Sequence, residues 1–248
     1  MKAPISACLI VKNDPLLEKA LLSIRPFVKE ICIVSTGGSS KETMDIIKKY
    51  ADKWEVFTKC NDKNGLIEDF SMARNRSFAL ANQPWLLFMD SDDEIIGADQ
   101  LKNIISQYNS PTQIMCKYEY AFDANGKSTL NLYRERLFFG KDNFEWKFPV
   151  HETVCAKVPV QTIQIESVIW KHNRQYSGVQ LENGRNLRIL EKYAKKNKDP
   201  RTLYYLGQEQ LDNNQHQNAI NTFIKYLDVA TWDDEKMMAL LQLVELTK

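Results

Sequence analysis

The first part of the sequence alternates short apolar runs with segments of helical spacing, and this alternation constrains the fold more than any other feature. The apolar runs have the length of strands and are Ile5–Val11, Glu30–Ser35, Glu55–Thr58 and Trp85–Met89. The intervening segments place apolar residues on one helical face and are Asp14–Ser23, Lys41–Tyr50 and Asp69–Ala81. Because a strand that is apolar throughout needs cover on both faces, the pattern predicts a parallel sheet with helices on both sides.

The sequence pattern changes between Gln113 and Trp170. Strand-like runs here contain aromatic residues and are separated by turns. The strand-like runs here are Met115–Phe122, Leu130–Phe139 and Ser167–Trp170. The pair Asn125-Gly126 between the first two is typical of a hairpin turn. This half is therefore predicted to be antiparallel or mixed, and the fold class is α/β with a Rossmann-like mixed sheet.

The sequence becomes helical after about Tyr176. Small and apolar residues then fall at the anchor positions of a tetratricopeptide-like repeat, counted from Pro200, and these are Leu206, Gly207, Ala219 and Phe223. Three segments have helical spacing, namely Leu203–Leu211, His216–Leu227 and Asp234–Leu246. A generic helical cap is the alternative interpretation. We predict two domains, residues 1–175 and 176–248.

A tail of one and a half repeats cannot bury both of its faces by itself. We therefore expect either that the tail packs on the first domain or that the natural chain continues beyond Lys248.

The composition of the chain limits the cellular compartments and the classes of partner that are expected for it. The five cysteines form no CxxC pair, which favours a reducing compartment over a disulfide framework or a structural zinc site. The opening residues lack the features of a signal peptide, and no apolar run has the length of a transmembrane helix. A net charge of +1 gives no general attraction to nucleic acid. A cytoplasmic location is expected, with no nucleic-acid partner and no transmembrane segment.

An acidic cluster, Asp90-Ser91-Asp92-Asp93-Glu94, follows the apolar run that ends at Met89. Ligands bind at the carboxyl ends of strands in sheets of this kind. Asp90 and Asp92 are two residues apart, so their side chains share a face of an extended backbone and can bind one hard cation. A solvated loop that caps a following helix is the ordinary alternative. The cluster is therefore a candidate site for a metal with bound phosphate.

Four blocks of the chain resemble family 2 glycosyltransferases, which have the GT-A fold. The blocks are Ile5-Ser6-Ala7-Cys8-Leu9-Ile10-Val11-Lys12-Asn13-Asp14, Glu30–Gly37 with Ser40, Asp69-Phe70-Ser71-Met72-Ala73-Arg74-Asn75, and Trp85–Asp92. Pro149-Val150-His151-Glu152 and His172 are similar to later elements of the family. The helical tail is similar to that of members that include peptide and protein glycosyltransferases.

The resemblance implies a metal-dependent, inverting transferase of the hexosyltransferase type. Its donor would be a nucleotide diphosphate sugar, most commonly of uridine, and its acceptor a peptide, a protein or a glycan. Asp92 would be the principal ligand of Mn²⁺ or Mg²⁺ in the DxD motif. Asp90 would contact the ribose or the metal, and His172 would complete the metal shell, although a structural hydrogen bond is an equal alternative for His172.

The resemblance also assigns residues to the nucleotide sugar. Those expected to contact the donor are Asn13, Asp14, Ser35, Asp69, Arg74, Asp90 and Ser91. Arg74 would lie near the diphosphate, where a guanidinium can chelate phosphate oxygens. Asp69 matches an acidic position of the family but is equally well explained as a helix N-cap. Ser35 replaces an acidic residue that often reads the base or ribose, so the choice of base is open.

An inverting transfer needs a base that takes the proton of the acceptor. Glu152, next to His151, is the candidate base, and the competing carboxylates are Asp93, Glu94 and Asp123. A salt bridge to an arginine is the alternative role for Glu152.

Two other functions fit parts of the sequence. A nucleotidyltransferase would have a glycine-rich loop after the first strand, whereas this chain has Lys12-Asn13-Asp14-Pro15 there. A non-catalytic, repeat-bearing binding protein would more naturally have lost one of the two aspartates of the motif.

Overall fold

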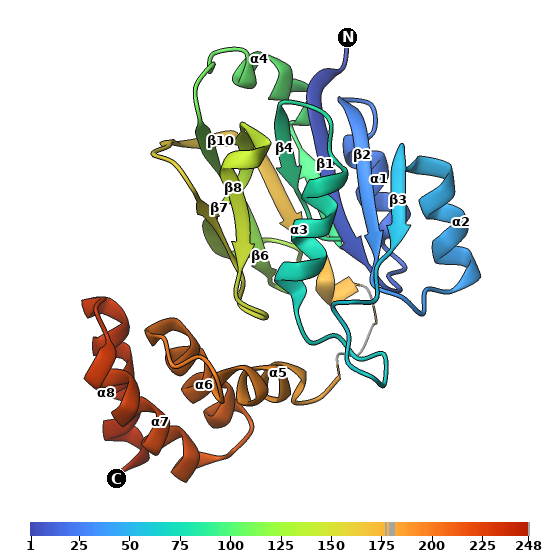
Figure 1. The fold of residues 1–248 in the computed structure, drawn as a ribbon. Coiled ribbons are helices and arrows are strands. Elements are labelled where there is room, and N and C mark those ends of the chain that lie inside the picture. The colour runs from blue at the N-terminus through green and yellow to red at the C-terminus, as the bar shows by residue number, and fades with distance from the viewer. Residues whose placement is uncertain (177, 179–181, 248) are drawn as a thin grey trace. The chain divides into compact units, whose positions relative to one another are not determined.

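The computed structural model describes residues 1–176, 178 and 182–247 (Figure 1). The chain forms two compact units. The first unit comprises Met1–Lys147 and Thr153–Val179, and the second comprises Phe148–Glu152 and Gln180–Lys248. Within the described residues, no helix has the length and apolar character needed to cross a membrane.

The first unit is built on an eight-stranded sheet with the order β3-β2-β1-β4-β7-β6-β10-β5. The strands are β1 Ala3–Val11, β2 Val28–Ser35, β3 Lys53–Val56, β4 Trp85–Phe88, β5 Asp93–Ile96, β6 Thr112–Phe122, β7 Ser128–Phe139 and β10 Gln161–His172. Strands β1 to β4 are parallel, whereas β7 is antiparallel to both β4 and β6. The predicted mixed α/β sheet is confirmed. Strand β3 begins two residues before the predicted run, and β5, within the acidic segment, was not predicted.

Helices cover both faces of this sheet, as expected from its apolar strands. The helices are α1 Leu17–Ile24, α2 Lys41–Tyr50, α3 Phe70–Leu80, the 3-10 turn η1 Ala98–Gln100 and α4 Leu101–Ile105. Leu9 of β1 packs in the core with α1, α2 and α4, while its neighbour Cys8 packs in the core that contains Phe78 of α3. In Figure 1, α3 crosses the near face of the sheet, in front of β1 and β4. A two-stranded sheet, β8 Phe144–Lys147 with β9 Thr153–Ala156, adds Phe144 and Trp146 to the α3 side.

Register irregularities interrupt the pairing of β6 with both of its neighbours, β7 and β10. Leu137 of β7 pairs with Ile114, and Glu135 pairs with Met115, so Arg136 is an extra residue in this ladder. Strand β10 has a register shift between Ile165 and Ile169 where it pairs with β6. Bulges of this kind redirect side chains and are frequent beside active sites.

The second unit is helical. Its helices are α5 Arg185–Ala194, α6 Pro200–Asp212, α7 His216–Val229 and α8 Asp233–Leu246. Asp199 caps α6 by accepting a hydrogen bond from the Thr202 backbone at 3.0 Å, and Pro200 occupies the first turn, where its missing N–H costs nothing. The three predicted helices are present. The residues at the repeat anchor positions are buried, namely Leu206, Gly207, Ala219 and Phe223.

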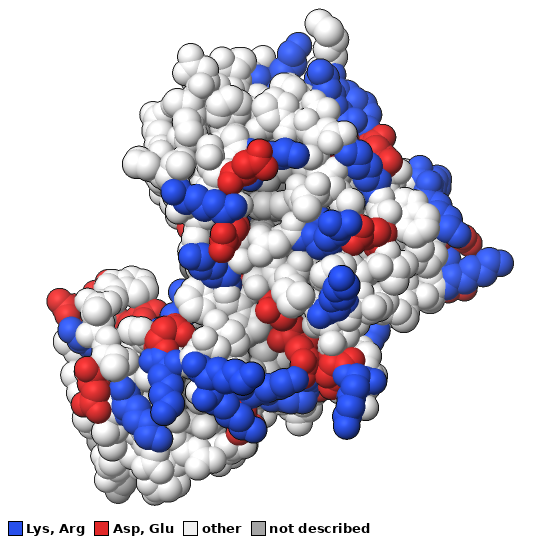
Figure 2. Space-filling view, viewed as in Figure 1, with Lys and Arg blue, Asp and Glu red and all other residues white. Residues whose placement is uncertain are grey.

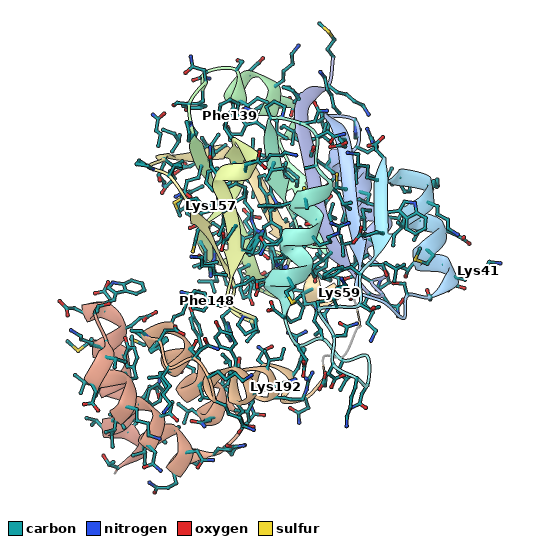
Figure 3. All side chains as sticks on the ribbon, in the orientation of Figure 1. Lys41, Lys59, Phe139, Phe148, Lys157 and Lys192 are labelled. Atoms are coloured by element: carbon teal, nitrogen blue, oxygen red, sulfur yellow. The ribbon has the colours of Figure 1, made fainter. Side chains whose placement is uncertain are left out.

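Charge is unevenly distributed along the second unit. Basic side chains are concentrated in and just after α5, and the exposed ones are Lys192, Lys195, Lys196 and Lys198. Figure 2 shows Lys and Arg gathered over α5, where Figure 3 labels Lys192. Of these lysines, Lys192 lies in the last turn of α5, where a positive charge complements the helix dipole.

Gly207→Ala is expected to destabilise the second unit. A Cβ at position 207 would lie 2.6 Å from Cε1 of Phe223, a ring that is completely buried. Alanine favours the helix by about 1 kcal/mol, whereas overpacking against three atoms of a buried ring should cost about 2–3 kcal/mol, the upper part of the usual range, so we expect a net loss of about 1–2 kcal/mol in the free energy of unfolding. Urea unfolding of the full chain measures it.

The double variant Gly207→Ala/Phe223→Leu is the control, because the smaller side chain makes room for the methyl group. Its loss should be smaller than the sum of the two single losses. A Gly207→Ala protein that is as stable as the wild type would show that the contact between the two helices is looser than the structure indicates.

Candidate active site

The acidic cluster lies where β4 ends, and hydrogen bonds fix the chain on its approach to the cluster. The indole N–H of Trp170, a fully buried residue of β10, donates to the carbonyl of Phe88 at 3.1 Å. The backbone N–H of Asp90 donates to Oδ2 of Asp93 at 3.0 Å. The backbone N–H of Asn173 donates to the carbonyl of Asp92 at 2.9 Å. The turn from Asp90 to Asp93 is therefore attached to the neighbouring strand.

Two arginines balance the charge of Asp90. Nη2 of Arg74, on α3, lies 3.0 Å from Oδ1 of Asp90. Burial alone would raise the pKa of Asp90, but the positive charges of Arg74 and Arg136 outweigh burial and hold the pKa below its usual value. Asp90 is therefore ionised and already has cationic partners.

Both arginines are held against aromatic rings. The guanidinium carbon of Arg74 lies 4.3 Å from the centre of the Phe88 ring, and that of Arg136 lies 4.9 Å from it. Arg136 also lies 4.4 Å from the ring of Tyr118, and its buried Nε has no hydrogen-bond partner. Sequence reasoning missed Arg136. A bulge is defined by the pairing of two strands, so the sequence of one strand does not reveal it. The one local signal for Arg136 was a charged residue directly before the apolar residues Leu137 and Phe138.

The surroundings of Asp92 differ from those of Asp90, because other carboxylates lie around Asp92 and no arginine of the described residues is hydrogen-bonded to it. It is only 6% exposed, and its nearest cationic groups are Nδ1 of His172 at 3.6 Å and Nη1 of Arg174 at 3.8 Å. Burial, followed by the negative charge of Asp90, raises the pKa of Asp92 to about 7. Asp92 is therefore the carboxylate of the cluster whose charge is least compensated.

His172 is held by a cross-strand pair and two tyrosines. It lies opposite Asp93 in the antiparallel pairing of β10 with β5. Its Nδ1 lies 3.1 Å from Oδ1 of Asp93 and 2.9 Å from the hydroxyl of Tyr118, and its ring stacks on Tyr120 with centroids 5.2 Å apart. Burial lowers the pKa of His172, but the hydrogen bond to Asp93 and the charges of Asp92 and Asp93 produce a net rise. Protonated or metal-bound, His172 would stabilise the acidic cluster.

The donor groups of this cluster fit a divalent metal. Asp92, Asp93 and His172 each offer an atom, and these three atoms lie within 4.8 Å of one another. Carboxylate oxygens suit a hard divalent cation such as Mn²⁺ or Mg²⁺, and Asp92, the carboxylate whose charge is least compensated, gives a cation a reason to bind. Of the three predicted ligands, the structure brings Asp92 and His172 together, whereas Asp90 is paired with Arg74. Asp93 was not predicted to be part of this group.

Asp14 connects the loop after β1 to the acidic motif. Its Oδ2 accepts a hydrogen bond from the hydroxyl of Ser91 at 3.0 Å, and its Oδ1 accepts one from the Leu16 backbone at 2.9 Å. Arg174 lies 4.0 Å from the same Asp14 oxygen that binds Ser91. Two of the predicted donor-binding residues, Asp14 and Ser91, therefore contact each other beside the cluster.

Asn13 and Ser35 fasten the loop after β2. Oδ1 of Asn13 accepts a hydrogen bond from the Ser40 backbone at 2.6 Å, and its amide group donates to the Gly38 carbonyl at 3.2 Å. Ser35 is 1% exposed, and its hydroxyl lies 2.7 Å from that of Ser39. Both side chains support the loop in this structure, and their contacts with a nucleotide remain predictions.

Asp69 is the N-cap of α3. Its Oδ1 accepts hydrogen bonds from the Met72 backbone at 3.0 Å and from the Ser71 hydroxyl at 2.6 Å. These bonds explain why an aspartate stands at this position. They fix the start of the helix that carries Arg74, and a direct contact of Asp69 with a nucleotide remains a prediction.

His151 and Glu152 belong to the segment Phe148–Glu152 of the second unit. Nε2 of His151 lies 2.8 Å from Glu209, and its ring stacks on Tyr205 with centroids 4.2 Å apart. Arg201 donates to the His151 carbonyl at 2.8 Å. Phe148, labelled in Figure 3, and His151 both have positive φ, of 69° and 51°, which is uncommon for residues with a side chain. Helix α6 thus holds this segment, and catalytic roles for His151 and Glu152 remain predictions.

The fold and the cluster together define a class of protein. The sheet, whose parallel half ends at the acidic cluster, has the mixed α/β arrangement of the GT-A fold. Residues 6–161 match the family model described as glycosyl transferase family 2, which is more than half of the chain. The chain therefore belongs to glycosyl transferase family 2, and this part of it is a glycosyltransferase domain.

The chain is also similar to solved structures and to one curated protein. The structure is similar to Staphylococcus aureus TarS, with a TM-score of 0.56 at 12% identity, over 99% of this chain and 54% of that one. It is equally similar to residues 1–349 of TarS in complex with UDP-GlcNAc, over 89% of that chain. A TPR repeat-containing protein of Synechococcus elongatus is 28% identical over 155 residues, which are 61% of this chain and 36% of the relative. At such identity the solved structures support the fold alone.

Proposed function

We propose that this protein is a metal-dependent, inverting glycosyltransferase that uses a nucleotide diphosphate sugar, with a uridine nucleotide as the first candidate. The observation that carries the proposal is the pairing of Asp92 with His172 at the end of β4. Asp92 is buried, has the least compensated charge of the cluster and lies beside the imidazole of His172. Asp90, two residues earlier, is already balanced by Arg74.

The proposed metal site contains Asp92 and His172, with Asp90 as a further candidate ligand. Bound Mn²⁺ or Mg²⁺ would supply positive charge to balance the diphosphate as it leaves the sugar. Arg74 is proposed to bind a phosphate oxygen, because its guanidinium already lies next to Asp90 at the end of β4. Asn13, Asp14, Ser35, Asp69 and Ser91 are proposed to form or support the nucleotide-sugar site.

Transfer itself is a single displacement in this proposal. The acceptor oxygen bonds to the anomeric carbon, the bond from that carbon to the diphosphate oxygen breaks, and the acceptor proton passes to a carboxylate. We propose Glu152 for this base, with His151 as its neighbour. The acceptor is proposed to be a peptide, a protein or a glycan, and the helical unit is proposed to be tetratricopeptide-like. That unit would contribute to acceptor recognition.

The cysteines support the proposed cytoplasmic location. All five are free thiols, and Cys8, Cys32, Cys60 and Cys116 are buried. Free thiols are typical of proteins in a reducing compartment.

Calorimetric titration with nucleotide diphosphates and their sugars tests the proposal directly. Binding of UDP or UDP-GlcNAc should be tighter with Mn²⁺ than with a chelator. A protein that binds no nucleotide diphosphate under either condition would refute the proposed function.

The same titrations test the role of Ser35. Because a serine replaces the acidic residue of relatives, we expect the affinities for uridine, thymidine and guanosine diphosphates to differ by modest factors. The buried hydroxyl of Ser35 is already paired with Ser39, which leaves little capacity for selective readout. A preference of about 3 kcal/mol, roughly a hundredfold, would show that other groups select the base.

A further inference from the structure

We propose that Glu209 of α6 is a positioning residue for sugar transfer, because it holds His151 and thereby the segment that carries Glu152. The catalytic consequence rests on the proposed function, in which Glu152 is the base. The cause lies in contacts within the second unit, which contains both the segment Phe148–Glu152 and α6.

The segment Phe148–Glu152 has a backbone conformation that its residue types do not favour. It joins β8 to β9 in the chain. Phe148 and His151 have φ angles of 69° and 51°, in the left-handed region that residues with a side chain seldom occupy. Such conformations persist where surrounding contacts hold them, and they are frequent at functional sites. The segment therefore needs partners elsewhere in the second unit.

Glu209 binds the side chain of His151. Oε1 of Glu209 lies 2.8 Å from Nε2 of His151 and accepts a hydrogen bond from the Asn186 amide group at 2.9 Å. Burial raises the pKa of Glu209, but the hydrogen bonds from His151 and Asn186 outweigh burial and hold the pKa below its usual value. An ionised carboxylate only accepts hydrogen bonds, so Nε2 of His151 donates to Glu209.

Two other side chains of α6 hold the same histidine. The ring of Tyr205 stacks on that of His151 with centroids 4.2 Å apart and an interplanar angle of 12°. Nη2 of Arg201 donates to the His151 carbonyl at 2.8 Å, and the guanidinium carbon lies 4.8 Å from the centre of the Tyr205 ring. The carbonyl of His151 belongs to the peptide bond that leads to Glu152. Fixing both the ring and this carbonyl therefore fixes where the side chain of Glu152 begins.

The three holding residues share one face of α6. Arg201, Tyr205 and Glu209 follow one another at intervals of four residues, which brings them to the same side of a helix. One helix face thus binds one residue of the segment through a cation, a ring and a carboxylate. An ordinary loop anchor would serve stability alone, whereas the residue anchored here adjoins the proposed base. Loss of the anchor should therefore displace the base.

The first test is the position of the His151 ring, measured by nuclear Overhauser effects between its protons and those of the Tyr205 ring in the full chain. The protein has three histidines, so a His151→Asn variant assigns the signals. The wild type should show these effects, because the rings are stacked. Glu209→Ala should lose them. Asp212→Ala is the matched control and should keep them, because Asp212 is an exposed carboxylate at the end of the same helix.

The second test is turnover with a hydroxyl acceptor, measured in two backgrounds. Glu209→Ala should lower kcat by about tenfold to a hundredfold, because a displacement of about 1 Å can cost a hundredfold. KM for the nucleotide sugar should not change, since the proposed donor site lies in the first unit. In the Glu152→Gln background the same substitution should lower kcat by less than about twofold, because no base is left to position.

Two further variants exclude a general loss of structure. Glu209→Gln keeps an acceptor oxygen for His151 and should retain more turnover than Glu209→Ala. If Glu209→Ala does not fold, His151→Asn takes its place in the kinetic test. Asparagine tolerates a positive φ and lacks the ring that Glu209 binds. Circular dichroism and calorimetry of donor binding confirm that each variant is folded.

Three outcomes would overturn the proposal. Contacts between His151 and Tyr205 that persist in Glu209→Ala would show that Glu209 does not hold the ring. An equal loss of turnover in both backgrounds would show that Glu209 does not act through Glu152, and so would near-normal turnover of Glu152→Gln. If the wild type transfers no sugar, the proposed function fails, and the Overhauser comparison still decides whether Glu209 holds His151.

Discussion

Replacing Asp92 by asparagine is expected to abolish transfer and to remove the dependence of nucleotide binding on metal. An amide balances little of the charge of a divalent cation, and Asp92 is the one aspartate of the motif without a hydrogen-bonded arginine. Calorimetric titration of the Asp92→Asn protein with UDP should give similar affinities in the presence of Mn²⁺ and in the presence of a chelator. Turnover should fall by about a thousandfold or more, since removal of charge stabilisation from a transition state has effects of this size.

The same variant should be more stable than the wild type when no metal is present. Burial and the charge of Asp90 raise the pKa of Asp92 to about 7, so the ionised carboxylate destabilises the folded state. That cost is fully present above pH 7, and it disappears as the pH falls toward the ordinary value of about 4 for an aspartate. The melting temperature of Asp92→Asn, measured with chelator, should therefore exceed that of the wild type at pH 8, and the difference should vanish near pH 4.

Asp99→Asn is the matched control, because Asp99 is exposed on η1 of the same unit. It should bind nucleotide with wild-type dependence on metal and show no gain in stability. If Asp92→Asn retains metal-dependent binding, Asp92 is not the principal ligand and the proposed site is wrong.

Replacing Glu152 by glutamine is expected to lower turnover by about a hundredfold to ten-thousandfold, provided that proton transfer limits the rate. Glutamine keeps the shape of the side chain and cannot take a proton. Binding of the nucleotide sugar should persist, because the proposed donor site consists of residues of the first unit. Steady-state kinetics with a hydroxyl acceptor, combined with calorimetry of donor binding, measures both effects.

The control is Glu191→Gln, because Glu191 is an exposed carboxylate on α5 of the same unit. This variant should leave turnover unchanged. Near-normal turnover of Glu152→Gln would shift the role of the base to Glu94 or Asp123. Asp93 is a poorer candidate, because its buried carboxylate already accepts several hydrogen bonds.

The contrast between Asp90 and Asp92 shows why sequence spacing alone left the ligand set open. The two residues stand in one short motif and have the same chemistry. Their pKa values move in opposite directions because Arg74 and Arg136 approach Asp90, while like charges surround Asp92. Arg74 is 16 residues away in the sequence and Arg136 lies on another strand. No local pattern specifies that both of them meet Asp90.

Local patterns in the sequence determined the architecture. Apolar runs of strand length predicted β1, β2 and β4, because a strand covered on both faces must be apolar throughout. Helical spacing predicted α2 with the bounds that the structure has, and the structure adds that Ser40 caps its first turn. These features depend on neighbours a few residues away, and that is why they can be read from one chain.

Only the tertiary structure decided what the site residues contact. The short strand β5 forms inside the acidic cluster because β10 offers it an antiparallel partner, and that pairing places Asp93 opposite His172. Arg136 is redirected by a bulge in its pairing with β6, and His151 is held by residues of α6 about fifty positions later. Such contacts arise from register and packing between distant segments. Sequence could therefore name candidate residues at this site, while the fold determined the partners of each one.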